Sequence, residues 1–347
     1  MRVRRVASRS ILSLLVVGLP FVVTATPLLS GGATAATCPS QTLNIPPTAA
    51  TPNLDYPFGI ATNAAGDIFV ADSDTNTIHE FDATGHEIMT IPATAATPNL
   101  SDMGQLAVDS SGNIYVTVRD NSDVIKFDST GHQVMEIPAS AATPNLSEPE
   151  GMAVDSAGNI YVGDEGSGYI YRFNSAGTQT LAIPASAGTP TFADPEGLAV
   201  DSAGNIYTAS DPSNTVYKFD STGHQVMTIA ATDATPNLDQ PIGVAVDADG
   251  HIYVGSQGGT VYQFDSAGHQ GFAILDTDAT PNFQAPAQVA VSPNGANLYI
   301  SDKYNDNVYV FCTGVLISAT TTTTTEAPTS TTSTTVQAVA TSPEFTG

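Results

Sequence analysis

The sequence predicts an all-β fold, a β-propeller of six blades with four antiparallel strands in each. A related segment occurs six times, and the Phe that ends its third strand recurs at spacings of 46, 46, 46, 45 and 47 residues. These residues are Phe81, Phe127, Phe173, Phe219, Phe264 and Phe311. The copies are rich in β-forming residues, are bounded by Gly, Asn or Asp, and lack helical periodicity. A four-stranded unit that repeats about every 45 residues is typical of propellers.

Each unit contains four segments of strand length. Representative copies are strand a at Gly197–Asp201, b at Asn159–Val162, c at Thr215–Phe219 and d at His224–Ile229. Strand a is built from Gly, Ala, Leu and Val, which suits the crowded axis where the sheets converge. The Asp-Ser-Ala-Gly-Asn link between a and b predicts a turn capped by its Asp, with a Gly that tolerates positive φ. The recurrent Ala-Thr-Pro-Asn-Leu segment then returns the chain across roughly 14 Å from strand d to the next strand a.

Both ends of the chain differ from the repeats. An Arg-rich start, an apolar run at Ile11–Val23 and the small residues Ala33–Ala35 are typical of a secretory signal. An uncleaved membrane anchor is the alternative, but the run is short for a span of roughly 20 residues and contains Pro20. The last 30 residues include 13 Thr and offer little apolar surface to offset the entropy of ordering. We therefore predict a signal peptide at 1–36, the propeller at 37–317 and a disordered Thr-, Ser- and Pro-rich tail at 318–347.

The two cysteines, Cys38 and Cys312, flank the repeats. Gln41–Ile45 aligns with strand d of the other units although no strands a to c precede it, whereas the sixth unit ends after strand c at Phe311. The N-terminal strand should therefore complete the sixth blade and remove an exposed pair of sheet edges. In that alignment the cysteines lie two residues apart across the missing c–d turn, which favours a disulfide in an exported protein. Free thiols or a metal pair are the alternatives.

The repeat resembles that of a known family. Pro149–Asp164 reads Pro-Glu-Gly-Met-Ala-Val-Asp-Ser-Ala-Gly-Asn-Ile-Tyr-Val-Gly-Asp, and with the following Ile170-Tyr-Arg-Phe-Asn it resembles an NHL repeat. The resemblance covers about Pro39–Phe311. It implies a six-bladed NHL-type propeller from a secreted bacterial protein, similar to the extracellular sensor propellers of some bacterial receptor kinases. NHL propellers include ligand-binding domains, sensor domains and occasional enzymes, so the resemblance implies a fold more than an activity.

The charge balance excludes two kinds of partner. The chain has 9 Lys+Arg against 34 Asp+Glu, and four of the basic residues lie in the first ten positions. Without the leader the formal charge is 5 − 34 = −29. Such a surface repels phosphate backbones and anionic lipid, so we expect no nucleic-acid partner and no membrane insertion after signal cleavage.

No catalytic group of residues stands out in the sequence. His86, His132, His224 and His269 recur at the turn before strand d, so they lie on separate blades and cannot converge on one ion. Strand a carries no His, whereas zinc-dependent propeller lyases use inward-facing His clusters. Neither a Gly-x-Ser-x-Gly elbow nor a P-loop occurs. We predict no catalytic residue and no cofactor.

The channel face of the propeller carries the candidates for ligand binding. Glu150 and Glu196 begin strand a of adjacent blades, where the other blades have apolar residues or Gly, and the b–c loops open on the same face. The candidate residues are Glu150, Glu196, Arg119, Asp120, Asp164, Asp211, Lys303 and Tyr304, with Asp123 and Glu165 on the same loops. Two close carboxylates can also bind a hard cation, so a Ca²⁺ site formed by Glu150 and Glu196 is the alternative.

These observations favour a secreted, non-enzymatic propeller, either free or associated with the cell surface or cell wall. We expect a monomer that binds a protein, a peptide or a cell-wall glycan at its channel face. The alternative is an enzyme, a metal-dependent lyase or lactonase-like hydrolase of the Ca²⁺ type with an axial carboxylate site.

Overall fold

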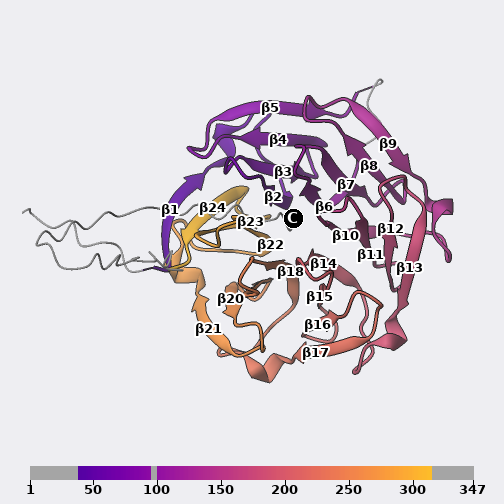
Figure 1. Cartoon of the computed structure of the whole chain (residues 1–347). Coiled ribbons are helices and arrows are strands. Elements are labelled where there is room, and N and C mark those ends of the chain that lie inside the picture. The colour runs from indigo at the N-terminus through magenta and orange to yellow at the C-terminus, as the bar shows by residue number, and fades with distance from the viewer. Residues whose placement is uncertain (1–37, 95–99, 315–347) are drawn as a thin grey trace, which may run out of the picture. The chain divides into compact units, whose positions relative to one another are not determined.

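The computed structural model describes residues 38–94 and 100–314, which form six sheets of four antiparallel strands each (Figure 1). Five sheets are built from consecutive strands, and the sixth has the order β1-β24-β23-β22. Short 3-10 turns are the only helical elements among the described residues. Within these residues no helix has the length and hydropathy of a membrane span. The predicted all-β propeller of six blades is confirmed.

The strands fall into four classes by their distance from the axis. The innermost strands are β2 (Pro57–Thr62), β6 (Met103–Val108), β10 (Pro149–Val154), β14 (Pro195–Val200), β18 (Pro241–Val246) and β22 (Pro286–Val291). The second strands are β3 (Ile68–Asp72), β7 (Ile114–Val118), β11 (Ile160–Asp164), β15 (Ile206–Ser210), β19 (Ile252–Ser256) and β23 (Asn297–Asp302). The third strands are β4 (Thr77–Phe81), β8 (Asp123–Phe127), β12 (Tyr169–Phe173), β16 (Thr215–Phe219), β20 (Thr260–Phe264) and β24 (Asn307–Cys312). The outermost strands are β5 (Glu87–Pro92), β9 (Gln133–Ile137), β13 (Gln179–Pro184), β17 (Gln225–Ile229), β21 (Gln270–Ile274) and β1 (Ser40–Ile45).

The innermost strands form a closed ring around the axis. Each packs against the innermost strand of the next blade, and β22 packs against β2 (Figure 1). The approach is close enough that a Cβ added at Gly59 would lie 2.5 Å from the carbonyl oxygen of Gly104 on the next strand. This crowding explains why the innermost strands are built from small residues, as the sequence indicates.

The Ala-Thr-Pro-Asn-Leu segments have a structural role in the connections between blades. The connections begin with 3-10 turns, namely η1 (Pro47–Ala49), η2 (Ala139–Ala141), η3 (Ala185–Ala187), η4 (Ala231–Asp233) and η5 (Asp276–Asp278). The Leu that ends the motif is buried, as at Leu54 and Leu146. The first residue of the outermost strand in the next blade then binds the Thr, so that the Thr143 amide donates to the Gln179 side chain.

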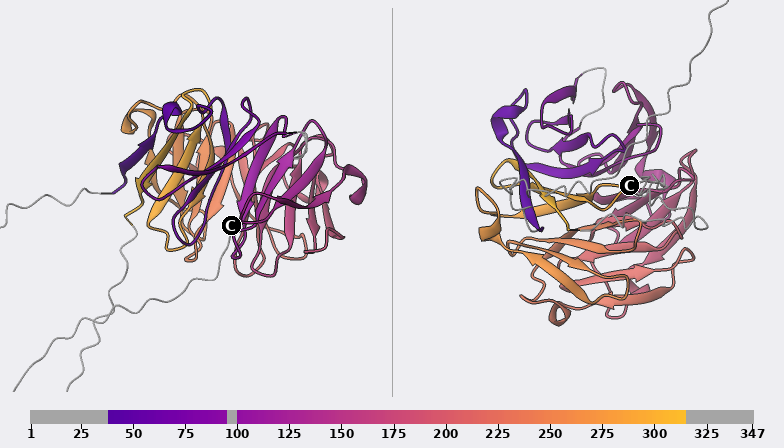
Figure 2. Two further views of the ribbon diagram at one scale, coloured as in Figure 1. Left: turned by 90° about the horizontal axis from the view of Figure 1, so that it is seen from above. Right: turned by 60° about the vertical axis from the view of Figure 1, so that its left-hand side comes forward.

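The N-terminal strand completes the sixth blade. β1 pairs with β24 in antiparallel register, with Gln41 opposite Phe311 and a bulge before Leu43. The strand pair in blade four has the same pattern, with Gln225 opposite Phe219. Gln41 also binds the connection before blade six, since its Oε1 accepts from the Thr280 amide at 2.7 Å. Figure 2 shows β1 beside the last strands of the chain. The predicted closure is confirmed.

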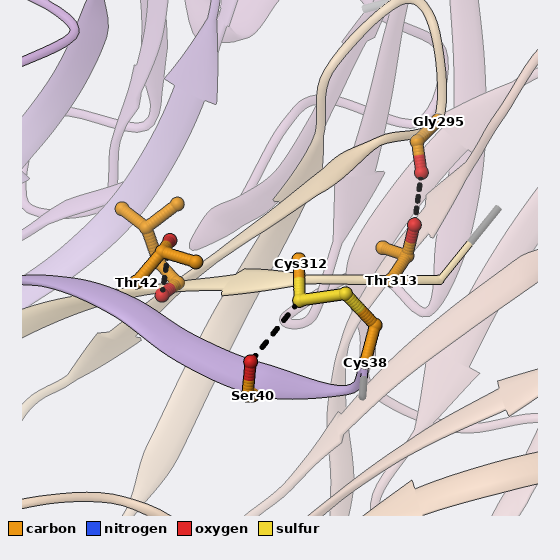
Figure 3. Close-up of a disulfide and its surroundings, with 7 residues drawn as sticks. Cys38, Ser40, Thr42, Gly295, Cys312 and Thr313 are labelled. Carbon is orange, nitrogen blue, oxygen red and sulfur yellow. Dashed lines mark hydrogen bonds between the residues drawn. A yellow bond between two sulfur atoms is a disulfide. The ribbon is translucent and has the colours of Figure 1, made fainter. Parts of the chain in front are cut away.

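The two cysteines form a disulfide at this seam (Figure 3). Their Cα atoms are 5.5 Å apart, and the bridge joins residues separated by 274 positions. The Ser40 hydroxyl lies 3.2 Å from the Cys312 sulfur. The described residues contain no free cysteine, so the free-thiol and metal alternatives for this pair are wrong. Disulfides persist in oxidising compartments.

Strand c was predicted with the observed bounds, Thr215–Phe219, and the other strands differ from the predicted ranges by one or two residues. The innermost strands begin earlier, at the Pro that precedes the Gly, and the second strands run on to the polar residue that ends them, as at Asp164, for which the sequence predicts a loop. The predicted signal peptide at 1–36 and tail at 318–347 lie outside the described residues.

Removing the disulfide should destabilise the ring without changing its fold. We expect the Cys38→Ser/Cys312→Ser variant to lose about 2–4 kcal/mol of unfolding free energy, because the covalent link restricts the unfolded chain. Denaturant titration with circular dichroism measures the loss. Peptide maps of the native protein that are the same with and without reductant would contradict the assignment.

Candidate functional site

A polar pocket opens at the end of the axial channel where the innermost strands begin. We call it the mouth pocket; its volume is about 150 Å³. All six blades contribute to its wall, which consists of Tyr56, Phe58, Ser73, Asp102, Met103, Arg119, Glu150, Glu165, Glu196, Gln257 and Lys303. These residues lie at the starts of the innermost strands and on the loops after the second strands. The expectation that these two sets of segments share one face is confirmed.

The wall of the mouth pocket has two chemically different halves. Blades two, three and four contribute charged side chains, namely Asp102, Arg119, Glu150, Glu165 and Glu196. In blades five, six and one the position that matches Glu150 is apolar, and Ile242, Ala287 and Phe58 form a small buried cluster with Tyr56 packed against it. Of this cluster, Phe58 and Tyr56 line the pocket, beside the charged Lys303 of blade six. The pocket can therefore contact charged and apolar parts of one ligand.

Arg119 organises the charged half. Its Nη1 lies 2.8 Å from Glu150 Oε2 and its Nη2 lies 2.7 Å from Glu165 Oε2, while Nε is 3.7 Å from Asp102 Oδ2. Both Nη distances are those of charge-assisted hydrogen bonds. The two Nη atoms are thus engaged by residues of blade three, whereas the buried Nε has no hydrogen-bond partner.

Glu150 and Glu196 differ in whether a neighbouring positive charge pairs with the carboxyl group. Burial raises the pKa of Glu150 to about 7, and the neighbouring Arg119 opposes this rise. Glu196 has no hydrogen bond or ion pair with any residue in the described part of the chain. Burial therefore raises its pKa further, to about 9, and the charge of Glu150 adds to the effect. Glu196 is a carboxyl group held mainly in its neutral form at pH 7.

Lys303 projects from the loop after β23 and lies among aromatic rings. Its Nζ is 5.6 Å from the ring centre of Tyr56, 5.5 Å from that of Phe58 and 5.5 Å from that of Tyr304. Such contacts stabilise an ammonium group. Burial lowers the pKa of Lys303, while the carboxylates of Glu150 and Glu196 act in the opposite direction. Tyr304 itself is 58% exposed and forms part of the rim.

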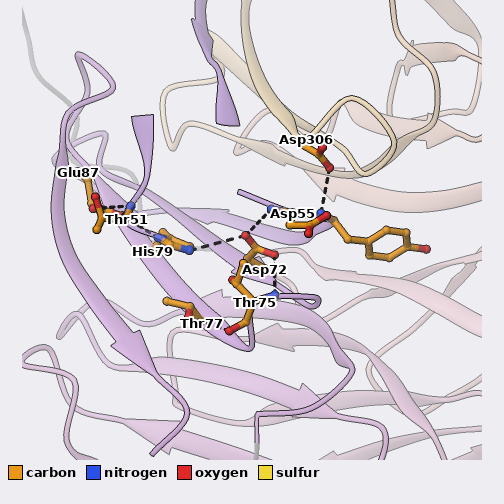
Figure 4. A network of polar contacts seen from close by, with 9 residues as sticks. Thr51, Asp55, Asp72, Thr75, Thr77, His79, Glu87 and Asp306 are labelled. Carbon is orange, nitrogen blue, oxygen red and sulfur yellow. Dashed lines mark hydrogen bonds and ion pairs between the residues drawn. The ribbon is translucent and has the colours of Figure 1, made fainter. Parts of the chain in front are cut away.

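Tyr56 is held in place by a polar network of blades six and one (Figure 4). Its amide donates to Asp306 Oδ1 at 3.0 Å, and the neighbouring Asp55 amide donates to Asp72 Oδ2 at 2.8 Å. Asp72 lies 3.8 Å from Nε2 of the buried His79, whose Nδ1 is 2.7 Å from Glu87. Burial raises the pKa of Asp72 to about 7 and lowers the pKa of His79. The network anchors the segment that carries Tyr56 and Phe58.

Further along the innermost strands lies a smaller cavity, of about 30 Å³. Gln105 on β6 reaches across the axis, where its Oε1 accepts from the amides of Met152 and Leu198, each at 2.9 Å. Its Nε2 donates to the Leu198 carbonyl at 3.2 Å. Around it the wall is apolar, with residues such as Leu106 and Val244. A polar ligand is therefore better accommodated at the mouth than deeper along the axis.

The structure brings together four of the eight predicted site residues in the pocket wall and one at the rim. Glu150, Glu196, Arg119 and Lys303 line the pocket, and Tyr304 borders it. Glu165, which was expected on the same loops, also lines it.

The other three predicted residues do not line the pocket. Asp120 accepts a hydrogen bond from Ser101 at 2.5 Å, and Asp211 is 3.5 Å from Gln240 Nε2. Asp164 is fully buried and accepts from the Ser147 amide at 2.8 Å, so it pins the connection between blades; burial raises its pKa to about 6. Asp72 makes the equivalent contact in blade one, which explains why this Asp recurs.

Sequence reasoning missed much of the apolar half of the pocket. The sequence did not identify Tyr56 and Phe58 as site residues, because most blades carry residues without a distinguishing pattern at these two positions. The informative signal is the same one that singled out Glu150, namely departure from the repeat at the start of an innermost strand. Asp102, Ser73 and Gln257 also line the pocket and carry no distinguishing pattern.

The recurrent histidines and aspartates are turn residues, as predicted. The His86, His132 and His224 rings each lie 2.7–2.8 Å from a Thr hydroxyl of the same turn. Asp155 accepts from the amides of Ala157 and Asn159 in the a–b turn. Across residues 38–94 and 100–314 no group of three or more His, Cys, Asp or Glu is arranged to hold a metal ion.

The comparisons with known proteins agree with the fold. Residues 140–173 and 233–264 match the model of the N-terminal part of strictosidine synthase-like proteins. The chain is a six-bladed β-propeller. An NHL-type repeat is consistent with these findings. No curated protein has a matching sequence.

Several solved structures share the fold at low sequence identity. A streptogramin B lyase is 14% identical, with a TM-score of 0.55 over 74% of this chain and 93% of that one. Virginiamycin B lyase from Staphylococcus aureus is 14% identical, with a TM-score of 0.55 over 78% and 98%. A catalytically inactive His-to-Ala variant of the latter enzyme, with quinupristin, is 15% identical, with a TM-score of 0.53 over 76% and 86%. At such identities the similarity concerns the fold alone.

The raised pKa of Glu196 predicts a pH-dependent effect of its replacement. Because the folded state favours the neutral form, Glu196 lowers stability increasingly as the pH rises from about 4.5 towards 9. Glu196→Gln should match the native protein near pH 4.5 and be more stable at pH 8, by roughly 1–3 kcal/mol. Thermal unfolding at both pH values measures the difference.

Asp194→Asn is the matched control for this experiment. It removes a carboxylate two residues away in the same blade, at a positive φ of 46° that Asn tolerates. The control should show no comparable gain at pH 8. A Glu196→Gln variant that is less stable than the native protein at pH 8 would contradict the prediction.

Proposed function

We propose that this protein is a secreted, non-enzymatic propeller that binds a protein, peptide or cell-wall glycan through the mouth pocket and its rim. The observation that carries the proposal is the placement of uncompensated polar side chains, Glu196 and Lys303, beside exposed and buried aromatic rings in one concave site. Concave sites with a few convergent polar groups and perturbed pKa values are the usual places of ligand binding.

The chemistry of the pocket supports binding over catalysis. Arg119 pairs with one oxygen each of Glu150 and Glu165, and these ion pairs disfavour a role of either carboxylate as a base in the empty pocket. The recurrent histidines lie in outer turns, and His79 lies in the interior of blade one. The exposed Tyr304 at the rim suits contact with a larger partner.

The location and the state of the protein belong to the same proposal. The leader predicted at 1–36 and the disulfide both fit export, and the predicted tail at 318–347 fits a stalk that holds the propeller at the cell surface or cell wall. We propose a monomer in which 37–317 is the folded unit.

The alternative is a metal-dependent lyase or lactonase-like hydrolase with Ca²⁺ at Glu150 and Glu196. Its support is the fold shared with streptogramin-inactivating lyases. The charges of the pocket argue against it, because Arg119 already occupies Glu150 and Lys303 lies near both carboxyl groups. A divalent cation would have to displace one positive group and approach another.

Replacing the rim tyrosine should weaken partner binding. Full-length protein is applied to arrays of peptides and wall glycans, and the ligands found are titrated with the native protein and with Tyr304→Ala. We expect about a tenfold or greater loss of affinity, since exposed Tyr residues often dominate interfaces. Val226→Ala on β17 is the matched control, because Val226 is equally exposed, at 56%, on an outermost strand. Equal affinities for the two variants would place the binding surface elsewhere.

Calcium should have no effect on stability if the binding proposal is correct. We expect the unfolding temperature of metal-free protein to be the same with EDTA and with millimolar Ca²⁺, a concentration that saturates weak extracellular sites. Differential scanning calorimetry makes the measurement. A calcium-dependent rise that Glu150→Gln abolishes would favour the enzymatic alternative.

A further inference from the structure

Two ionisable side chains of the mouth pocket, the buried Lys303 and the half-buried Glu196, have no polar partner among the described residues. Lys303 is only 7% exposed, and its ammonium makes no hydrogen bond or ion pair with the residues that the structure describes. Glu196 likewise has no such partner there. Both side chains line the pocket. By contrast, Glu150 and Glu165 are paired, since Arg119 engages them at 2.8 and 2.7 Å.

One of the two unpartnered groups is an acid and the other a base, and they do not meet. Glu196 lies in blade four and Lys303 in blade six, on either side of the Gln257 loop of blade five. No nitrogen–oxygen distance between them is within the 4.0 Å of an ion pair. Both line the same pocket, whose volume is about 150 Å³, so they can contact two ends of one small molecule.

Leaving such groups unpaired costs free energy. A buried charge without a partner is strongly unfavourable, and aromatic contacts compensate an ammonium group only in part. A ligand that supplies the missing partners recovers this free energy. The pocket thus favours a ligand with an ammonium group for Glu196 and a carboxylate for Lys303.

We infer that the mouth pocket binds a small zwitterion of the α-amino-acid type, with its ammonium group at Glu196 and its carboxylate at Lys303. This inference rests on the binding site of the proposed function and adds a small-molecule ligand to the partner classes named there.

The apolar half of the pocket adds a preference for the side chain of the ligand. Tyr56 and Phe58 flank Lys303, and Phe58 belongs to the apolar cluster with Ile242 and Ala287. A ligand whose carboxylate reaches Lys303 places its other atoms beside these rings. Burial of an aliphatic side chain there is favourable, so leucine suits the pocket better than glycine.

Ligands with one type of charge match the pocket less well. A phosphate or dicarboxylate would bring negative charge towards Glu150, Glu165 and Glu196. A simple cation would pair with Glu196 but meet Lys303 and Arg119. A neutral sugar satisfies neither unpaired group by charge. Only a zwitterion compensates both ends at once.

Three probes that differ by one charge test this inference. Isothermal titration of the full chain is made with L-leucine, with L-leucinamide, which lacks the carboxylate, and with N-acetyl-L-leucine, which lacks the ammonium. Loss of a charged hydrogen bond should weaken binding about tenfold or more. We therefore expect leucine to bind at least about tenfold more tightly than either analogue.

Two variants assign each end of the zwitterion to its residue. Glu196→Gln should remove the preference for leucine over N-acetyl-leucine while keeping the preference over leucinamide. Lys303→Met should do the reverse. Both replace an unpaired buried group by a neutral one of similar size, so both should fold, which thermal unfolding verifies. Asp194→Asn, which removes a negative charge in blade four outside the pocket wall, should leave both preferences unchanged.

The outcomes separate this inference from the proposed function. Equal affinity for the three probes, no binding of any, or an equal effect of Asp194→Asn and Glu196→Gln would overturn the inference. If leucine does not bind but a peptide or glycan from the array binds in a Tyr304-dependent way, the inference fails and the proposed function stands. If neither binds, both fail. Charge-selective binding that the two variants alter as stated supports the inference.

Discussion

The pairing of β1 with β24 is the constraint on which the rest of the structure depends. Without this pairing the third strand of blade six, β24, would have an unpaired edge. The two ends of the chain would then be joined neither by a disulfide nor by strand hydrogen bonds, and only the packing of the innermost strands would close the ring. The mouth pocket takes residues from every blade, so its geometry exists only when the ring is closed. The disulfide and the contacts of Gln41 with Thr280 hold β1 in the same register that the hairpin turns impose elsewhere. The mouth pocket therefore forms only when β1 closes the ring.

The site arises where the repeat is broken. The residues that recur in every blade have structural roles within that blade. Aspartates cap the a–b turns, and the buried Leu of the connection fills the space between blades. The Asp or Ser that ends many second strands binds the preceding loop. Because these duties are fulfilled separately in each blade, a residue at the start of one innermost strand can change without loss of the fold. Glu150 and Glu196 on one side, and Phe58 on the other, are such changes. Their combination makes a pocket with distinct charged and apolar halves.

The sequence predicted the fold more completely than the site. Periodic Phe and Gly residues determine the number and order of the strands. The single strand d at the N-terminal end and the missing strand d of the sixth unit determine the closure, because an unpaired strand needs a hydrogen-bonding partner. The face carrying Glu150, Glu196, Arg119 and Lys303 also followed from topology. Side-chain partners did not: Asp164 belongs to a buried contact with Ser147, and Tyr56 enters the pocket because Asp306 of a different blade holds its amide. Such contacts join residues up to 250 positions apart, and one unaligned sequence carries no record of them.

The uncompensated groups of the pocket are tolerated because the core is divided among blades. Each blade interface has its own buried hydrophobic cluster, for example that of Tyr207, Val216 and Ile229 with the next blade. The free-energy cost of removing Glu196 and Lys303 from water therefore affects only the mouth pocket. No strand pairing depends on the charge of these two residues. A protein that kept these two groups only for stability would gain by replacing them with apolar residues, as blades five and six do with Ile242 and Ala287. Their presence in a closed, otherwise well-satisfied ring is most simply explained by a ligand that carries the complementary charges.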